Sequence, residues 1–248
     1  MKTGYRAFYF GILLCSFLIG NGFQQPVVKQ TGLAGAWQLQ TPNGEEVLLL
    51  VDGYLTHTRY NKNTKQFQQS RGGTYQADNG RLTTQIEFDT KDKEQVGQKL
   101  QYQVSLNQQG LTTNLNGQQA TWKRIDDAQA PLVGVWHITQ RMQEGTLTPI
   151  HQTGPRKTLK ILTGTRFQWA AINPATKEFS GSGGGTYTFQ DGKYTEHIEF
   201  FSRDSSRVGA SLSFDGKLQD GHWHHSGLSS RGDKIYEVWS RVNQQKAL

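Results

Sequence analysis

The sequence predicts an all-β protein built as two tandem antiparallel up-and-down β-barrels. Three observations support this fold class. Short stretches alternate between apolar and polar residues, helical periodicity is nearly absent, and a set of short motifs occurs twice in the same order. Because alternation with a period of two is typical of half-buried strands, we expect about eight strands in each copy.

Each motif of the first half returns in the second half at an offset that grows from 99 to 117 residues. A period near 100 is the length of a small domain and exceeds the ~20–50 residues of a solenoid or propeller repeat. The growing offset places the differences in loops, and we interpret the sequence as a tandem duplication. The pairs are Leu33–Trp37 with Leu132–Trp136, Gly72–Tyr75 with Gly184–Tyr187, Ile86–Phe88 with Ile198–Phe200, and Trp122–Ile125 with Trp239–Val242.

The first 22 residues lie outside both copies and have the pattern of a secretory signal peptide. Lys2 and Arg6 precede an apolar run of 14 residues that ends at Gly20, and Gly20 and Gly22 supply small residues before the expected cleavage site. The run is shorter than the ~20 residues that cross a bilayer. We therefore expect a cleaved signal over 1–22, a secreted or periplasmic location, and no membrane span in the mature chain.

Composition excludes several other classes of site and partner. The only cysteine, Cys15, lies in the expected signal, so disulfides and cysteine-ligated metals are excluded and each domain must depend on its apolar core. The formal charge of +7 falls by two to +5 without Lys2 and Arg6, and acidic residues are interspersed with the basic ones. Because nucleic-acid-binding proteins gather basic side chains in patches, we expect no nucleic-acid partner.

Turn signals separate the alternating stretches in both copies. Asn-Gly and Asp-Gly pairs tolerate the positive φ of tight hairpin turns, so successive strands pair antiparallel, and closing such a meander into a barrel removes its exposed edges. We place the first barrel at 31–126 and the second at 131–243, joined by a short polar linker. The alternative is that the repeats pair as one intertwined sandwich. The turn signals are Asp52-Gly53, Asn79-Gly80, Asn116-Gly117, Asp191-Gly192 and Asp215-Gly216.

Each copy opens with a Gly-x-Trp motif and ends with a Trp-x-Arg motif. This pairing resembles the calycin superfamily, which includes the lipocalins, the fatty-acid-binding proteins and the avidins. The resemblance implies that Trp37 and Trp136 plug the closed ends of the barrels, and that Arg124 and Arg241 pack over their indole faces. A guanidinium can stack on an indole while it bonds to carbonyl groups at strand ends. The second copy is also similar to lipocalin-like domains of unknown function in bacterial membrane or secreted proteins, on the stretches 173–179, 183–187 and 232–239.

The second copy has gathered histidine, glutamate and tryptophan where the first has mainly threonine, glutamine and alanine. Period-two alternation places His197 with Glu199 on one strand face, and His222 with His224 on a face of another strand. Polar groups inside a barrel are costly unless they bond to one another or to a ligand. We therefore predict that these residues converge near the interior of the second barrel. The candidate ligand-binding residues are Trp169, Tyr187, His197, Glu199, His222, Trp223, His224 and Glu237.

Three interpretations of this set are open. The aromatic members form the walls of a pocket and the polar members orient a ligand, as in many small-molecule sites. Alternatively, the residues lie on the outer face or form a satisfied internal network without a ligand. In the third interpretation, His222 and His224 chelate a metal, completed by His197 or Glu199. The spacing does not require a metal, and we expect no metal and no cofactor.

No catalytic signature is present in the sequence. It has neither a Gly-x-Ser-x-Gly elbow nor a thiol nucleophile, and the run Gly183–Gly185 precedes a strand, which favours a bulge over a phosphate cradle. We expect a non-catalytic binding protein outside the cytoplasm, whose second barrel holds a small apolar or aromatic ligand and whose first barrel stabilises it or faces a partner. The alternative is a structural or protein-interaction module of a cell-envelope complex.

Overall fold

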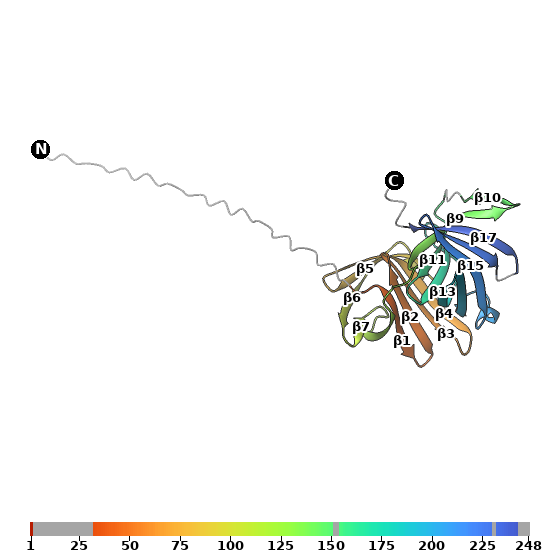
Figure 1. The fold of residues 1–248 in the computed structure, drawn as a ribbon. Helices are drawn as coiled ribbons and strands as arrows, with labels where there is room; N and C mark the ends of the chain where they lie inside the picture. The colour runs from red at the N-terminus through yellow and green to blue at the C-terminus, as the bar shows by residue number, and fades with distance from the viewer. Residues whose placement is uncertain (2–31, 151–153, 230–231, 243–248) are drawn as a thin grey trace.

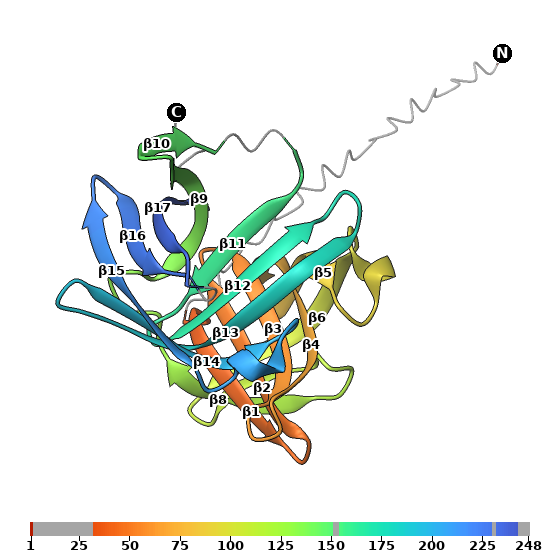
Figure 2. The same cartoon turned by 90° about the vertical axis from the view of Figure 1, so that its right-hand side faces the viewer.

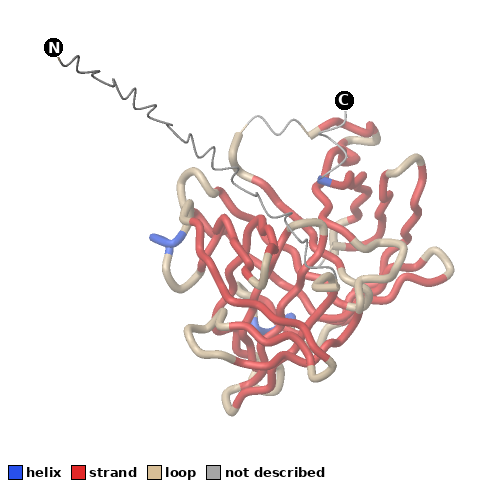
Figure 3. Tube along the Cα trace, turned by 90° about the vertical axis from the view of Figure 1, so that its left-hand side faces the viewer, coloured by secondary structure: helices blue, strands red, loops and turns tan. Residues whose placement is uncertain are grey.

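The computed structural model describes residues 1, 32–150, 154–229 and 232–242, and these residues confirm the predicted all-β fold with two closed antiparallel barrels in tandem (Figure 1). Strands dominate both halves (Figure 3), and the only helices of the described residues are two 3-10 turns. The expected signal at 1–22 lies, beyond Met1, outside the described residues. The first barrel consists of β1 (Gly35–Thr41), β2 (Gly44–Val51), β3 (Tyr54–Asn61), β4 (Gln66–Asp78), β5 (Arg81–Asp89), η1 (Lys93–Gln95), β6 (Lys99–Asn107), β7 (Gly110–Thr113) and β8 (Ala120–Asp126).

The second barrel repeats this order and adds one short strand. Its first strand, β9 (Gly134–Gln143), pairs with both β11 and β17 and so closes the barrel, while β10 (Thr146–Pro149) pairs only with the far end of β9. The remaining elements are β11 (Lys157–Leu162), β12 (Arg166–Asn173), β13 (Glu178–Gln190), β14 (Lys193–Phe201), η2 (Ser205–Arg207), β15 (Ser211–Gln219), β16 (His222–Leu228) and β17 (Lys234–Arg241).

Most of the predicted turns lie at hairpins, but one does not. Asp52, Asn79 and Asp191 have positive φ and, with the glycine after each, connect neighbouring strands. The expected turn at Asp215-Gly216 is wrong, because both residues lie inside β15 and the turn follows at Asp220. A Cβ at position 216 would lie 2.8 Å from the ring of Phe189, so this glycine makes room for packing rather than for a turn.

The closed end of each barrel has the same arrangement of tryptophan and arginine. The Arg124 guanidinium lies 4.0 Å from the ring centre of Trp37, and that of Arg241 lies 4.3 Å from the ring centre of Trp136. Each indole N–H donates to a main-chain carbonyl four residues earlier, at 3.0 and 2.8 Å. Each guanidinium also donates to carbonyl oxygens of the segment before the first strand. These hydrogen bonds link the last strand of the barrel to the chain that enters its first strand.

The two barrels pack side by side through the outer faces of their corresponding strands. Figure 2 shows β11, β12 and β13 crossing in front of the strands β2 to β4. An apolar core lies between the barrels, distinct from the two interior cores, and it gives the outer strand faces a buried role that period-two alternation alone does not predict. Its buried members are Ala36, Val47, Leu49, Val51, Tyr54, Tyr60, Val135, Leu159, Ile161 and Phe200.

Contacts across this interface are reciprocal, which indicates an approximate two-fold relation between the barrels. Phe67 stacks on Phe200 with ring centres 6.1 Å apart, and the residues at the corresponding positions, Phe179 and Phe88, stack at 5.9 Å. The amide nitrogen of Gln168 donates to two corresponding serines, Ser70 of the first barrel and Ser182 of the second, at 2.9 and 3.0 Å. The two barrels are therefore arranged like the two subunits of a homodimer within one chain.

Candidate functional site

The histidines that we expected to converge lie on the outer surface of the second barrel. His197 is exposed and its ring contacts the Ser211 hydroxyl at 2.7 Å. His222 is also exposed, at 2.8 Å from the Ser240 hydroxyl, and His224 lies beside a tyrosine hydroxyl at 2.9 Å. The expected convergence is therefore not found, because the interior of the barrel lies on the opposite face of both strands.

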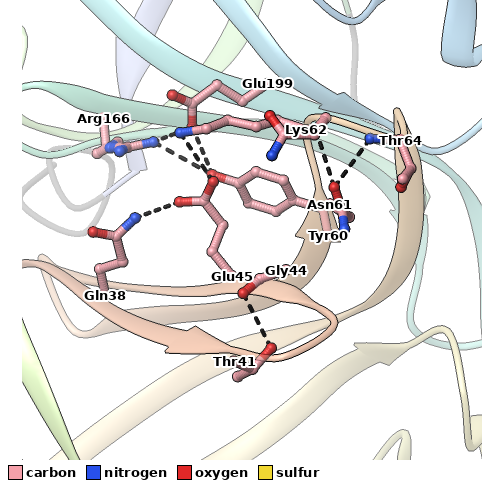
Figure 4. A network of polar contacts seen from close by, with 11 residues as sticks. Gln38, Thr41, Gly44, Glu45, Tyr60, Asn61, Lys62, Thr64, Arg166 and Glu199 are labelled. Atoms are coloured by element: carbon pink, nitrogen blue, oxygen red, sulfur yellow. Dashed lines mark hydrogen bonds and ion pairs between the residues drawn. The ribbon is translucent and has the colours of Figure 1, made fainter.

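Glu199 lies at the interface between the barrels rather than in a pocket of the second. It accepts a hydrogen bond from the Tyr60 hydroxyl at 2.6 Å and is ion-paired with Arg166 (Figure 4). Glu87, at the corresponding position, accepts from the Tyr54 hydroxyl at 2.8 Å and pairs with Lys157 of the other barrel at 2.7 Å. Both glutamates therefore hold the two barrels together.

Four predicted residues do lie within the second barrel. Trp223 is fully buried and Glu237 is 7% exposed, while the Tyr187 hydroxyl donates to the Thr163 carbonyl at 2.7 Å. Trp169 is half-buried at one end of the barrel, in edge contact with Phe201 at 5.4 Å. The structure thus divides the predicted set among the barrel interior, the interface and the outer surface.

A buried ion pair that the sequence analysis missed occupies the centre of the second barrel. Lys160 and Glu196 are 6% and 5% exposed, and the Lys160 ammonium lies 2.7 Å from the Glu196 carboxylate. Three aromatic rings surround the ammonium at 5.1–5.3 Å, those of Tyr194, Trp223 and Trp239. Because these rings and the ion pair fill the space between the strands, the centre of the second barrel is packed.

His225 is the third missed residue of this interior. It is 3% exposed, its ring lies 4.2 Å from that of Phe214, and neither ring nitrogen has a hydrogen-bond partner among the described residues. Its Nδ1 is 3.8 Å from the Glu237 carboxylate, beyond hydrogen-bond distance, and burial lowers the His225 pKa. Glu237 itself accepts from Trp239 at 3.1 Å and pairs with Arg141 at 2.8 Å.

The sequence carried a signal for these residues that was read on the wrong face. Glu196 alternates with the apolar residues Tyr194 and Ile198, and His225 alternates with Trp223. The strand face with more apolar residues points into the barrel. Polar residues on that same face were therefore the better candidates for an interior site. Lys160 gave a weaker signal, because it lies between the apolar Leu159 and Ile161 but β11 also contains Lys157 and Thr158.

The first barrel, expected to lack a site, holds a cavity of about 690 Å³. It lies where η1 connects β5 with β6 and where residues 114–119 connect β7 with β8. Its volume falls within the ~300–1,000 Å³ of small-molecule pockets. We call it the first-barrel cavity. Its lining residues are mostly polar and comprise Arg59, Gln69, Arg71, Asp89, Lys91, Asp92, Gln95, Leu100, Gln101, Tyr102, Leu115, Asn116 and Gly117.

One wall of the first-barrel cavity is fixed by a buried glutamate. Glu46 accepts from His57 at 2.8 Å, lies 3.2 Å from the Arg59 guanidinium, and accepts from the Asn116 amide. Burial alone would raise the pKa of Glu46, but its contacts with His57, Asn116 and Arg59 lower it below the ordinary 4.5. Burial also lowers the pKa of His57, so the pair consists of a carboxylate and a neutral imidazole at neutral pH.

Two other polar groups of the cavity are not satisfied within the protein. The Arg71 Nε and the Tyr102 hydroxyl are buried and have no hydrogen-bond partner among the described residues. Arg71 donates through Nη2 to the Leu115 carbonyl, and its guanidinium lies 5.5 Å from the ring centre of Tyr102. Buried polar groups are normally paired, so these two donors are exceptions among the residues that line the cavity.

The corresponding space in the second barrel is closed by aromatic side chains. The indole of Trp169 and the ring of Phe201 meet there, and a Cβ at Gly183 would lie 2.7 Å from that indole, so the glycine is required for this packing. Strand pairing aligns the two barrels and makes Trp169 the counterpart of His57. The first-barrel counterparts of Gly183, Phe201 and Phe214 are Arg71, Asp89 and Tyr102.

The described residues place no group of three or more histidine, cysteine, aspartate or glutamate side chains where they would hold a metal ion. None of the helices in these residues is long and apolar enough to cross a membrane. The chemistry offered by the first-barrel cavity is therefore that of hydrogen-bond donors, charges and one aromatic ring.

Comparison with known proteins adds a family match to the second half. A family model described as a domain of unknown function (DUF4488) matches residues 131–247, which include the whole second barrel. This match and the two closed barrels fit a lipocalin-like fold. A crystal structure of an uncharacterized protein from Bacteroides eggerthii DSM 20697 is similar to the chain, at 13% sequence identity and a TM-score of 0.30, over 44% of this chain and 98% of that one. No curated protein matches the chain.

Proposed function

We propose that the protein is a non-catalytic, extracytoplasmic binding protein of the calycin type, with its ligand in the first-barrel cavity. The observation that carries the proposal is a cavity of about 690 Å³ whose walls include buried donors without partners. A barrel that only had to be stable would fill this space, as Trp169 and Phe201 do in the second barrel. The extracytoplasmic part of the proposal rests on the signal-like pattern of residues 1–22.

The packed interior of the second barrel favours a supporting role for that half. Lys160, Glu196 and the surrounding rings fill its centre, and an apolar core joins its outer face to the first barrel. We therefore assign it the structural or partner-facing task that the sequence analysis had given to the first barrel. If the purified protein retains no ligand, the alternative is that the whole chain is a structural or protein-interaction module of a cell-envelope complex.

Native mass spectrometry of the protein purified from its own host tests this proposal. We expect added mass on the wild type, and its loss in Gln69→Trp, which places an indole among the residues that line the cavity. The matched control is Gln76→Trp on the same strand, at an exposed position outside the cavity lining. Added mass that persists in Gln69→Trp, or its absence from the wild type, would contradict a ligand site in the first barrel.

A further inference from the structure

We propose that the ligand of the first-barrel cavity is a small organic anion, bound through a carboxylate or another oxyanion between Arg71 and Tyr102. This inference rests on the proposed function and adds the chemical class of the ligand. Its basis is the combination of a cation without an acidic partner and an unpaired hydroxyl on neighbouring walls of one cavity.

Arg71 is a cation of the cavity lining that no acidic group of the described residues pairs with, and unlike the exposed Lys91 it is half-buried. Arg59 is paired with Glu46 at 3.2 Å, whereas no carboxylate lies within 4.0 Å of the Arg71 guanidinium in the part of the chain that the structure describes. Asp89 faces Arg71 across the strand pair, but its Oδ1 accepts main-chain N–H groups of Lys91 and Asp92 at 2.8 and 3.1 Å. The turn after β5 thus engages this carboxylate, and Arg71 reaches instead to a carbonyl.

Asp92, the other carboxylate of the lining, is also engaged by its own turn. It caps η1 by accepting from the Glu94 main-chain N–H at 3.1 Å, and its second oxygen accepts from the Gln95 side chain at 3.1 Å. Both acidic groups of the rim therefore serve the connection between β5 and β6. An oxyanion entering the cavity would supply the partner that Arg71 lacks, in the planar geometry that a guanidinium recognises best.

Tyr102 supplies a second donor beside Arg71. Its side chain is 9% exposed, and its hydroxyl has no hydrogen-bond partner among the described residues. Burial raises the pKa of Tyr102, so the hydroxyl keeps its proton at neutral pH and donates. Phenylalanine at the corresponding position of the second barrel, Phe214, shows that the fold does not need this hydroxyl.

The remaining lining favours a hydrophilic ligand over a lipid. Gln69, Gln95, Gln101 and Asn116 surround the two donors, and among the lining residues only Leu100 and Leu115 are aliphatic. Apolar ligands bind in apolar pockets, because polar walls that lose water without gaining partners cost free energy. The cavity therefore fits a compact molecule that carries hydroxyl or amide groups in addition to its negative charge.

The test compares two probes of the same shape and different charge, 4-fluorobenzoate and 4-fluorobenzamide, by fluorine NMR titration of the full chain at millimolar concentration. We expect the benzoate to bind more tightly than the benzamide. Arg71→Gln should weaken benzoate binding about tenfold or more, the equivalent of one charge-assisted hydrogen bond, and leave the benzamide unchanged. Tyr102→Phe should weaken the benzoate by a smaller factor, and Asp89→Asn, which keeps the acceptor oxygen of the turn, should strengthen it.

Arg81→Gln is the matched control, because Arg81 is an exposed arginine at the start of β5 outside the cavity lining, and we expect it to change neither titration. Equal binding of the two probes, no effect of Arg71→Gln and Tyr102→Phe, or no benzoate binding to the wild type would each overturn the inference. If one of these results is found while native mass spectrometry still shows added mass on the wild type that Gln69→Trp removes, the proposed function stands and only the ligand class is wrong. If native mass spectrometry shows no added mass that Gln69→Trp removes, both proposals fail.

Discussion

The two barrels share eight corresponding strands and the same tryptophan-arginine closure, but they differ in the polar residues of their interiors. At the centre, the first barrel has Leu48 and Thr84 where the second has the ion pair of Lys160 and Glu196. At the end beside η1, the first barrel is hollow and polar, whereas the second is closed by aromatic rings. Accumulated polar residues therefore do not by themselves identify a binding site, because in the second barrel Lys160 and Glu196 pair with each other.

The closure that both barrels share should give the largest effect. Trp136→Ala is expected to lower the free energy of unfolding by about 3–5 kcal/mol, the usual cost of removing a large buried aromatic side chain. Arg241→Ala should cost about 1–3 kcal/mol through lost packing and unpaired carbonyls. Because the guanidinium lies 4.3 Å from the indole, the two losses should not add.

Urea unfolding of both single variants and the double variant measures this coupling, and Trp37→Ala with Arg124→Ala repeats it in the first barrel. Similar coupling in both barrels would support a shared framework. Additive losses would mean that the arginine does not stabilise the barrel through the tryptophan.

The central ion pair distinguishes the second barrel from the first. Lys160→Leu leaves the Glu196 carboxylate buried without its partner, and we expect a loss of about 3–5 kcal/mol. Adding Glu196→Thr installs the residue pair of the first barrel and should recover most of that loss. Thermal unfolding of the wild type, Lys160→Leu and the double variant checks this, and a double variant no more stable than Lys160→Leu would show that the pair does more than satisfy its own charges.

Acid should destabilise the second barrel through Glu237. Burial alone would raise its pKa, but the nearby His225, Lys160 and Arg141 lower it from 4.5 to about 2 in the folded protein. Because the folded pKa lies below the unfolded value, this stabilisation is fully present above pH 4.5 and is lost as the pH falls towards 2.

Glu237→Gln should therefore cost about 1–3 kcal/mol at neutral pH and flatten the dependence of stability on pH over that range. The exposed Glu178→Gln on β13 serves as control. Unfolding curves at a series of pH values give the measurement, and an unchanged pH profile in Glu237→Gln would contradict the assignment.

The fold was predictable because its signals are local and repeated. Alternation, hairpin glycines and the duplicated motifs each depend on neighbours in sequence, and the duplication allowed each half to support the other. The interior of each strand was harder to assign, because both faces are partly buried. His197 and Glu199 lie on the same face of β14, yet His197 is exposed to solvent and Glu199 contacts the other barrel.

The first-barrel cavity was not predictable, since it depends on what other residues leave unfilled. Arg71 and Tyr102 have unremarkable neighbours in the sequence. Only the strand register shows that their counterparts, Gly183 and Phe214, belong to a barrel that is filled. A cavity that exists because side chains do not fill it leaves little signal in a single sequence.

The most direct test of a ligand cavity at one end of the first barrel, with none in the packed second barrel, is fluorine NMR of protein labelled with 5-fluorotryptophan, titrated with unlabelled benzoate. The label reports on both halves, since Trp37 and Trp122 belong to the first core and Trp136, Trp223 and Trp239 to the second. We expect Trp122, whose ring lies 5.4 Å from that of His57, to shift most, while the three tryptophans of the second core keep their positions. Shifts at Trp223 or Trp239 with none at Trp122 would contradict the account.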